Sequence, residues 1–353
     1  MVIFFTKAYN AETTLHRCVQ SVLNQTCGDF VYYLCDNAST DKTWDIMQNY
    51  ASCDKRIRLL RNEQNNILTG ADGWSDGKLI KHLPKEFDEQ HYYCALDADD
   101  EYKPGFLEKM LTFMLEKKLE VAACGTDMID AQTGALVRRK ALSQNITLED
   151  RVFADCFPTY RNFMVTMWGS LASLAVLKKC DFSQARQSPD FKDTIAAMEI
   201  FRNAGRAGVL AESLHKYYIS PHTDSYRYQP GWFWACNNLF RLSREYLLHY
   251  GEISRANEDY LQVLFLIVLK YILPRIQNAD VPLERRVDDL IQIFDDDRII
   301  EHLALDWKKV GIITDKSEFL REQIEWAERQ AEQELLCVKR LIHVLRNRLA
   351  ETS

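Results

Sequence analysis

Three aspartates stand together in the motif Asp97-Ala98-Asp99-Asp100, directly after the apolar run 92–96. That run has the length and composition of a buried strand, and Pro104 ends the extended pattern soon after the motif. The carboxylates are therefore expected at the C-terminal end of a strand, where open α/β sheets bind ligands. Clustered carboxylates are costly unless a cation neutralises them, and oxygen ligands favour Mg²⁺ or Mn²⁺. The Asp-x-Asp pattern predicts a divalent-metal site, with a solvated acidic turn as the alternative.

The elements that would carry this motif alternate between strand and helix signals up to residue 100. Apolar residues at i, i+3, i+4 and i+7 predict helices between short apolar strands. Strands are predicted at 2–5, 29–35, 57–60, 92–96, 121–124, 208–210 and 214–219. A β-α-β-α-β order implies right-handed crossovers and a parallel sheet. The predicted fold class is α/β, with a mostly parallel central sheet flanked by helices.

The composition becomes helical throughout after residue 228. Helices are predicted at about 232–250, 257–273, 283–294, 299–307 and 316–349. The last one carries an apolar stripe from Leu320 to Leu349 at nearly heptad spacing, which needs a partner to bury it. Packing within its own domain and homodimer formation both remain open. We predict two domains, 1–228 and 229–353, and we interpret the acidic triplet 295–297 as a solvated helix junction.

Overall composition narrows the class of protein. The chain has 353 residues, of which 47% are hydrophobic and 27% charged, and its net charge is -7 without any basic block, which argues against nucleic acid as a partner. Ten scattered cysteines without a C-x-x-C pair are typical of a reducing compartment. No signal peptide is expected, and no apolar run reaches the roughly 20 residues of a transmembrane span. We expect a cytoplasmic protein, free or peripheral to a membrane.

Four segments resemble the motifs of glycosyltransferase family 2, a group of inverting transferases with the GT-A fold. In chain order they are Ala8–Glu12, Ser21–Thr26, Asp36–Asp41 and Leu96–Asp100. The tyrosine-rich stretch 214–225 is similar to the last strand of that family and the loop after it. The resemblance covers residues 1–228 and implies a GT-A nucleotide-diphospho-sugar transferase fold with a C-terminal helical region.

The resemblance also implies roles for individual residues. Tyr9 would stack on the nucleotide base, Glu12 would give a polar contact, and Asp36 would accept from the base imide. Asp97 would face the ribose or the metal, and Asp99 would hold a metal that bridges the diphosphate. The implied nucleotide-binding residues are Thr6, Tyr9, Glu12, Asp36, Asn37, Asp97 and Ala98; the implied metal ligands are Asp99 and His222. Without the resemblance, helix-entry packing would explain Tyr9 and turn capping would explain Asp36.

An inverting transfer needs a base that takes the proton of the acceptor hydroxyl. The resemblance places this base near the start of a helix, where Asp193 is the first choice and Asp190 the second. Capping of the helix is the alternative explanation for Asp193. Trp168 would form the floor of an acceptor site, because sugars stack on aromatic faces, or else pack in the core.

The resemblance implies a metal-dependent, hexosyltransferase-type enzyme. It would move a sugar from a nucleotide-sugar donor to a hydroxyl of a glycan, a lipid-linked saccharide or a protein. A UDP-sugar is the preferred donor, and the metal would be Mn²⁺ or Mg²⁺. A Rossmann oxidoreductase is excluded because no G-x-G-x-x-G follows a strand. The alternative is a catalytically degenerate homologue that serves as an oligomeric scaffold or glycan-binding subunit, since the segment 69–73 lacks an arginine that this family often has.

Overall fold

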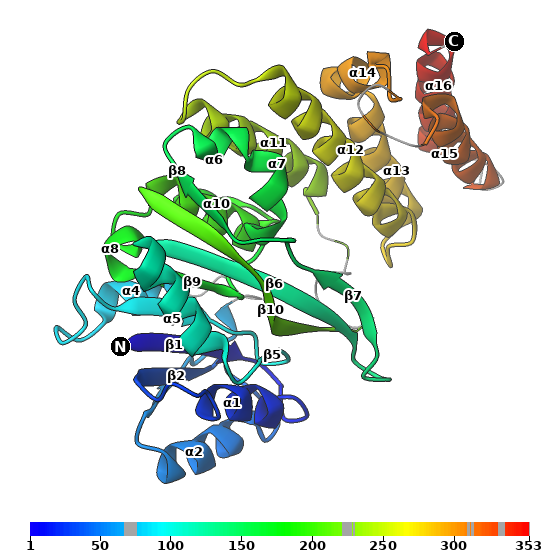
Figure 1. Cartoon of the computed structure of the whole chain (residues 1–353). Helices are drawn as coiled ribbons and strands as arrows, with labels where there is room; N and C mark the ends of the chain where they lie inside the picture. The colour runs from blue at the N-terminus through cyan, green and yellow to red at the C-terminus, as the bar shows by residue number, and fades with distance from the viewer. Residues whose placement is uncertain are drawn as a thin grey trace. The chain divides into compact units, whose positions relative to one another are not determined.

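The computed structural model describes residues 1–66, 76–220, 228, 230–308, 311, 314–330 and 336–352. It divides into two compact units (Figure 1). The N-terminal unit consists of Met1–Gln187 and Lys192–Pro221, and the C-terminal unit of Ser188–Phe191 and His222–Ser353. Each unit has its own hydrophobic core.

The N-terminal unit is built on one mixed sheet, in the order β3-β2-β1-β4-β9-β6-β10-β5, with β7 added to β6 and β8 to β10. Its strands are β1 (Val2–Ala8), β2 (Phe30–Asp36), β3 (Ile57–Arg61), β4 (Tyr92–Ala95), β5 (Glu101–Tyr102), β6 (Val121–Asp130), β7 (Leu136–Lys140), β8 (Ile146–Glu149), β9 (Ser170–Ser173) and β10 (Arg206–Ile219). The pairs β1–β2, β2–β3, β1–β4 and β6–β10 are parallel, whereas β9 runs antiparallel to β4 and β6. The predicted α/β fold with a mostly parallel central sheet is confirmed.

Both faces of this sheet are buried, as the apolar composition of its first strands predicts. Phe4 and Tyr32 share one face and one apolar cluster with α1 and α5, while Ile3 on the opposite face is also fully buried. The helical elements of the unit are α1 (Leu15–Leu23), α2 (Thr43–Cys53), α4 (Asp76–His82), α5 (Phe106–Lys117), α6 (Val152–Asp155), α7 (Phe157–Tyr160), a 3₁₀ turn (Arg161–Phe163), α8 (Leu174–Leu177), α9 (Ser183–Gln187) and α10 (Lys192–Asn203). Helices α1 and α5 thus pack against one face of the strands that precede the acidic motif.

Strand β10 corrects the prediction of two short strands at 208–210 and 214–219. It is one strand of 14 residues that follows β6 along most of its length, with irregular register between Leu210 and His215. A bulge of this kind keeps a long strand paired while it turns side chains to new directions. Polar Glu212 at the irregularity interrupts the apolar pattern, which is why the sequence suggested a break.

The C-terminal unit is helical in its described residues. Its helices are α11 (Trp232–Leu248), α12 (Arg255–Gln277), α13 (Leu283–Phe294), α14 (Asp297–Ala304), α15 (Lys316–Gln330) and α16 (Leu336–Glu351). Among these helices, and among all described ones, none is both long and apolar enough to cross a bilayer. The acidic triplet 295–297 lies at the junction of α13 and α14, where the Asp296 side chain caps α14, as predicted.

The single long helix predicted at 316–349 is wrong. Glu328 and Arg346 form an ion pair at 2.6 Å, although one continuous helix would separate them by about 27 Å. The described parts are two helices, α15 and α16, that pack against each other. Leu320 and Leu345, both from the apolar stripe, are buried in the core of their own unit. In its described residues the stripe is therefore covered mainly within the unit, in line with the first of the two open interpretations.

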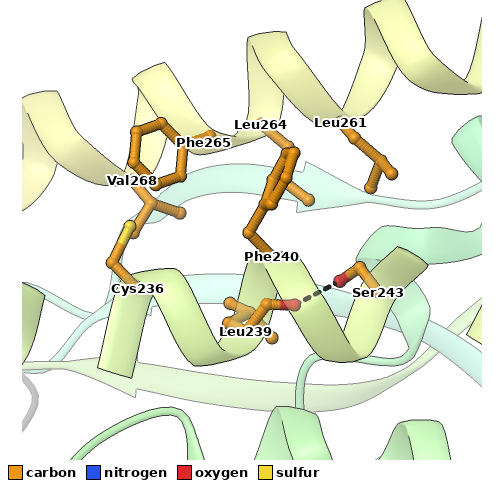
Figure 2. A pocket seen from close by; sticks show the side chains of 8 residues that line it. All are labelled: Cys236, Leu239, Phe240, Ser243, Leu261, Leu264, Phe265 and Val268. Atoms are coloured by element: carbon orange, nitrogen blue, oxygen red, sulfur yellow. Dashed lines mark hydrogen bonds between the residues drawn. The ribbon is translucent and has the colours of Figure 1, made fainter. Parts of the chain in front are cut away.

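A small cavity lies between α11 and α12 (Figure 2). It measures about 10 Å³ and is lined mainly by apolar side chains, with the Ser243 hydroxyl turned to the Leu239 carbonyl at 2.8 Å. An apolar void that barely accommodates one water is a packing defect rather than a ligand site.

Candidate functional site

The acidic motif follows β4 at the C-terminal end of the parallel strands, as predicted. Ligand oxygens of Asp97, Asp99 and Asp100 all lie within 4.8 Å of one another. Asp97 is exposed, Asp99 half-buried and Asp100 fully buried, so the group opens toward solvent on one side. Three hard oxygen donors at this spacing fit a divalent cation such as Mg²⁺ or Mn²⁺. Ala98 between them is almost fully buried and holds the loop to the core.

Asp100 joins the acidic motif to β10, a contact that the sequence analysis missed. Its Oδ1 accepts from the Tyr218 amide at 2.9 Å, and its Oδ2 lies 3.3 Å from His215 Nε2. Burial, together with the neighbouring Asp99 carboxylate, raises the pKa of Asp100 well above its usual range. Burial also lowers the pKa of His215 to about 3, so that this imidazole is neutral at physiological pH. Asp100 Oδ2 is buried and has no hydrogen-bond partner among the described residues, which is consistent with a cation site.

Arg17 holds the acidic loop from the side of α1. Its guanidinium donates to the main-chain oxygen of Asp99 and lies 3.5 Å from the centre of the Tyr218 ring. The neighbouring Cys18 thiol donates to the main-chain oxygen of Asp97 at 3.3 Å. Helix α1 and strand β10 therefore both donate hydrogen bonds to the acidic loop and orient its carboxylates. Arg17 was missed because its position on the helix carries no sign of what lies opposite in space.

Trp168 lies beside the acidic motif through main-chain pairing with Ala95, the last residue of β4. Its ring stacks on His215, with centroids 4.4 Å apart, and on Tyr217 at 5.3 Å. The side chain is half-buried, so one part packs in the unit and another part is reachable. Tyr102 braces the same corner, because its hydroxyl donates to the Ala95 carbonyl at 2.6 Å.

A second group of polar residues lies where β1, β2 and β3 end. Asp36 is fully buried; its Oδ1 accepts from the Ser39 amide at 3.0 Å and its Oδ2 lies 3.1 Å from Arg61 Nε. Asn37 is also buried and accepts from Asn62 Nδ2 at 2.8 Å. Beside these residues a cavity of about 470 Å³ is lined by Ala38, Ser39, Arg61, Asn62 and Glu63. Its volume is in the range of small-molecule sites.

The remaining predicted nucleotide residues have distinct environments. Tyr9, just after β1, is 41% exposed and is available to stack on a planar ligand. Glu12 is exposed, and its Oε2 accepts from the Lys42 amide at 3.1 Å next to the start of α2. Thr6 is fully buried, and its hydroxyl is 2.9 Å from the Tyr32 hydroxyl, so the structure gives it a place in the core below the site.

The predicted base residues lie near the start of α10. Asp193 is exposed in the first turn of that helix, in the N-terminal unit. Asp190 belongs to the other unit and is half-buried, with its Oδ1 accepting from the Phe191 amide at 2.7 Å. His222 and the segment 69–73 lie outside the described residues. The carboxylate of Asp193 is therefore exposed, and that of Asp190 is half-buried.

Comparison with known proteins gives a consistent picture. Residues 4–173 match the family described as Glycosyl transferase family 2. TuaG of Bacillus subtilis, a glycosyltransferase assigned to teichuronic acid biosynthesis, is 32% identical over 134 residues, which are 38% of this chain and 49% of TuaG. The uncharacterized glycosyltransferase YibD of Escherichia coli is 23% identical over 255 residues, covering 71% of this chain and 70% of YibD. The match to TuaG thus spans about half the length of that relative.

A solved structure resembles the fold. Residues 1–349 of Staphylococcus aureus TarS, crystallised with UDP-GlcNAc, superpose with a TM-score of 0.63 at 15% identity, covering 91% of each chain. At this identity the likeness concerns the fold alone.

Proposed function

We propose, from the match of residues 4–173 to Glycosyl transferase family 2, that the chain transfers a sugar from a nucleotide-sugar donor to an acceptor hydroxyl with inversion. The observation that carries the proposal is the group of three carboxylates at the C-terminal end of β4. Such a group at this edge of a GT-A sheet suits a metal-bound diphosphate. The ten cysteines are all free thiols, which supports a cytoplasmic location.

We propose that the donor is a UDP-sugar. The cavity beside Asp36 would take the base, with Tyr9 stacking on it and the Asp36–Asn37 turn reading its polar edge. Asp36 is paired with Arg61 at 3.1 Å, so base recognition would require this guanidinium to share or release the carboxylate. Glu12, in the turn before α1, and Thr6 of β1 would support this pocket.

Asp97, Asp99 and Asp100 would hold Mn²⁺ or Mg²⁺, with His222 as a further proposed ligand. Such a cation neutralises negative charge on a departing nucleoside diphosphate. Arg17 and the Tyr218 amide hold the acidic loop in place through hydrogen bonds to Asp99 and Asp100. Asp97 would also face the ribose. The loop is therefore prepared for the ion before it binds.

Asp193 would act as the base that takes the proton of the acceptor hydroxyl, with Asp190 as the second choice. Exposure of Asp193 at the start of α10 leaves its carboxylate accessible to an acceptor. Trp168 would present an aromatic surface to the acceptor sugar, since it lies beside the strand that leads to Asp97. Proton transfer and sugar stacking would thus come from separate elements of the same unit.

Calorimetric titration of UDP tests the proposal. With Mn²⁺ we expect binding; chelator and Asp99→Asn should each weaken it at least tenfold, because the diphosphate loses its bridging cation. Asp295→Asn is the matched control, since it removes a carboxylate from the other acidic triplet of the chain, at a helix junction. If neither UDP nor any other nucleoside diphosphate binds, the transferase proposal fails and a scaffold or glycan-binding role becomes the better hypothesis.

A further inference from the structure

A row of side chains crosses the sheet next to the acidic motif. Lys140 of β7 pairs with Thr126 of β6, Thr126 with His215 of β10, and His215 with Tyr102 of β5. Residues directly opposite each other on neighbouring strands point to the same face. Lys140 therefore shares a face with His215, whose ring contacts Trp168 and whose Nε2 is 3.3 Å from Asp100.

Lys140 is a largely desolvated cation that makes no ion pair in the described part of the chain. Its Nζ donates to the Asn162 carbonyl at 3.1 Å and lies 5.3 Å from the centre of the Trp168 ring. Within the described ranges no carboxylate pairs with it, although its neighbour Arg139 binds Asp127 at 2.6 Å. Burial lowers the pKa of Lys140 to about 8, so the ammonium is still mostly charged at neutral pH. Charges removed from water are ordinarily paired in proteins, and no carboxylate of the described residues pairs with this half-buried ammonium.

The cation and the aromatic ring next to it are both reachable. Lys140 and Trp168 are half-buried, and Trp168 is tied to the last residue of β4, two residues before Asp97. Stacking on His215 and Tyr217 fixes the plane of the indole. A rigid aromatic ring with an ammonium 5.3 Å from its centre suits a sugar ring that carries an anionic group.

We propose that Lys140 and Trp168 form an acceptor subsite for an acidic saccharide, with Trp168 stacking on the sugar and Lys140 pairing its carboxylate or phosphate. The proposal rests on the proposed transferase function and extends it by naming the class of acceptor. Lys140 is then a specificity-determining residue, since it would favour acidic acceptors over neutral ones of the same shape. It would not contribute to binding of the donor diphosphate.

The test is calorimetric titration of the full chain with probes that differ only in charge, with and without UDP and Mg²⁺. Tetragalacturonate and its methyl ester compare a carboxylate with a neutral sugar; glycerol 3-phosphate and glycerol do the same for phosphate. We expect at least one acidic probe to bind tenfold or more tightly than its neutral partner. The pair that shows this preference identifies the anionic group. Equal binding, or no binding, within both pairs overturns the proposal.

Four variants test whether the preference comes from this subsite. Lys140→Met should abolish the preference, whereas Lys140→Arg should retain it and Arg138→Met, an exposed cation of the same strand, should leave it unchanged. Trp168→Leu should weaken the acidic and the methyl-ester oligosaccharide alike. Survival of the preference in Lys140→Met, or a tenfold loss of UDP affinity in that variant, overturns the proposal. Loss of UDP binding by the wild-type protein would instead contradict the transferase function itself, and melting temperatures check that each variant folds.

Discussion

Acidification should destabilise the C-terminal unit through His302. This side chain is 2% exposed, and its ring lies 4.3 Å from the ring of Phe265. Its Nδ1 is 2.7 Å from the Arg298 carbonyl, while its Nε2 has no hydrogen-bond partner among the described residues. Burial lowers the pKa of His302 from 6.5 to about 4. The folded unit therefore holds a neutral imidazole.

The magnitude follows from proton linkage. Between pH 6.5 and pH 4 the unfolded chain binds a proton at His302 and the folded chain does not, so stability falls as the pH falls. One pKa unit corresponds to about 1.4 kcal/mol. The contribution of His302 to the free energy of unfolding should thus be about 2 kcal/mol lower at pH 5 than at pH 7.5, and about 3 kcal/mol lower at pH 4.

Urea unfolding at pH 7.5 and pH 5, followed by tryptophan fluorescence, measures this effect. Trp307 is a local reporter, because its indole donates to the His302 carbonyl at 3.0 Å. His302→Phe keeps an aromatic ring among its neighbours but cannot titrate, so it should lose about 2 kcal/mol less than the wild type between the two pH values. Exposed His249 provides the control, and His249→Phe should keep the wild-type dependence. If His302→Phe and the wild type lose the same stability on acidification, the reasoning is refuted.

Three further outcomes are expected. Tyr102→Phe should cost about 2 kcal/mol in urea unfolding, because its buried hydroxyl joins a β4 carbonyl at 2.6 Å and a main-chain amide at 3.0 Å; a cost below about 0.5 kcal/mol would contradict this. Arg17→Met should weaken Mn²⁺-dependent UDP binding several-fold by freeing the Asp99 loop, and an equal loss of metal-free binding would argue against that cause. Leu261→Ala should cost about 3 kcal/mol by enlarging the cavity between α11 and α12 (Figure 2), whereas Leu248→Ala, 55% exposed, should cost under about 1 kcal/mol.

The acidic motif shows what local sequence can specify. An apolar run followed by Asp97 and Asp99 predicts a strand end with carboxylates, and the structure has that arrangement. The prediction holds because the length of a strand, the alternation of its side chains and the residue at which it ends depend on residues close in sequence. The same local logic identified the α/β architecture and the helix junction at 295–297.

The surroundings of the motif could not be foreseen in this way. Asp100 meets Tyr218 across 118 positions of the chain, and Arg17 reaches Asp99 across 82. These contacts depend on the order of strands in the sheet and on the register of β10 with β6 and β5, which composition and periodicity do not encode. The fold at the C-terminus likewise depended on packing, because α15 and α16 bury an apolar stripe that a continuous helix would also display.

The sequence by itself therefore determined the fold class and the place of the clustered carboxylates, since both depend on patterns a few residues long. Only the tertiary structure decided which side chains brace and complete the site. Lys140 became informative once β7 was seen to align it with His215 and Trp168, without an acidic partner in the described part of the chain. The physical reason is that charge pairing and burial are properties of neighbours in space, and strand register chooses those neighbours.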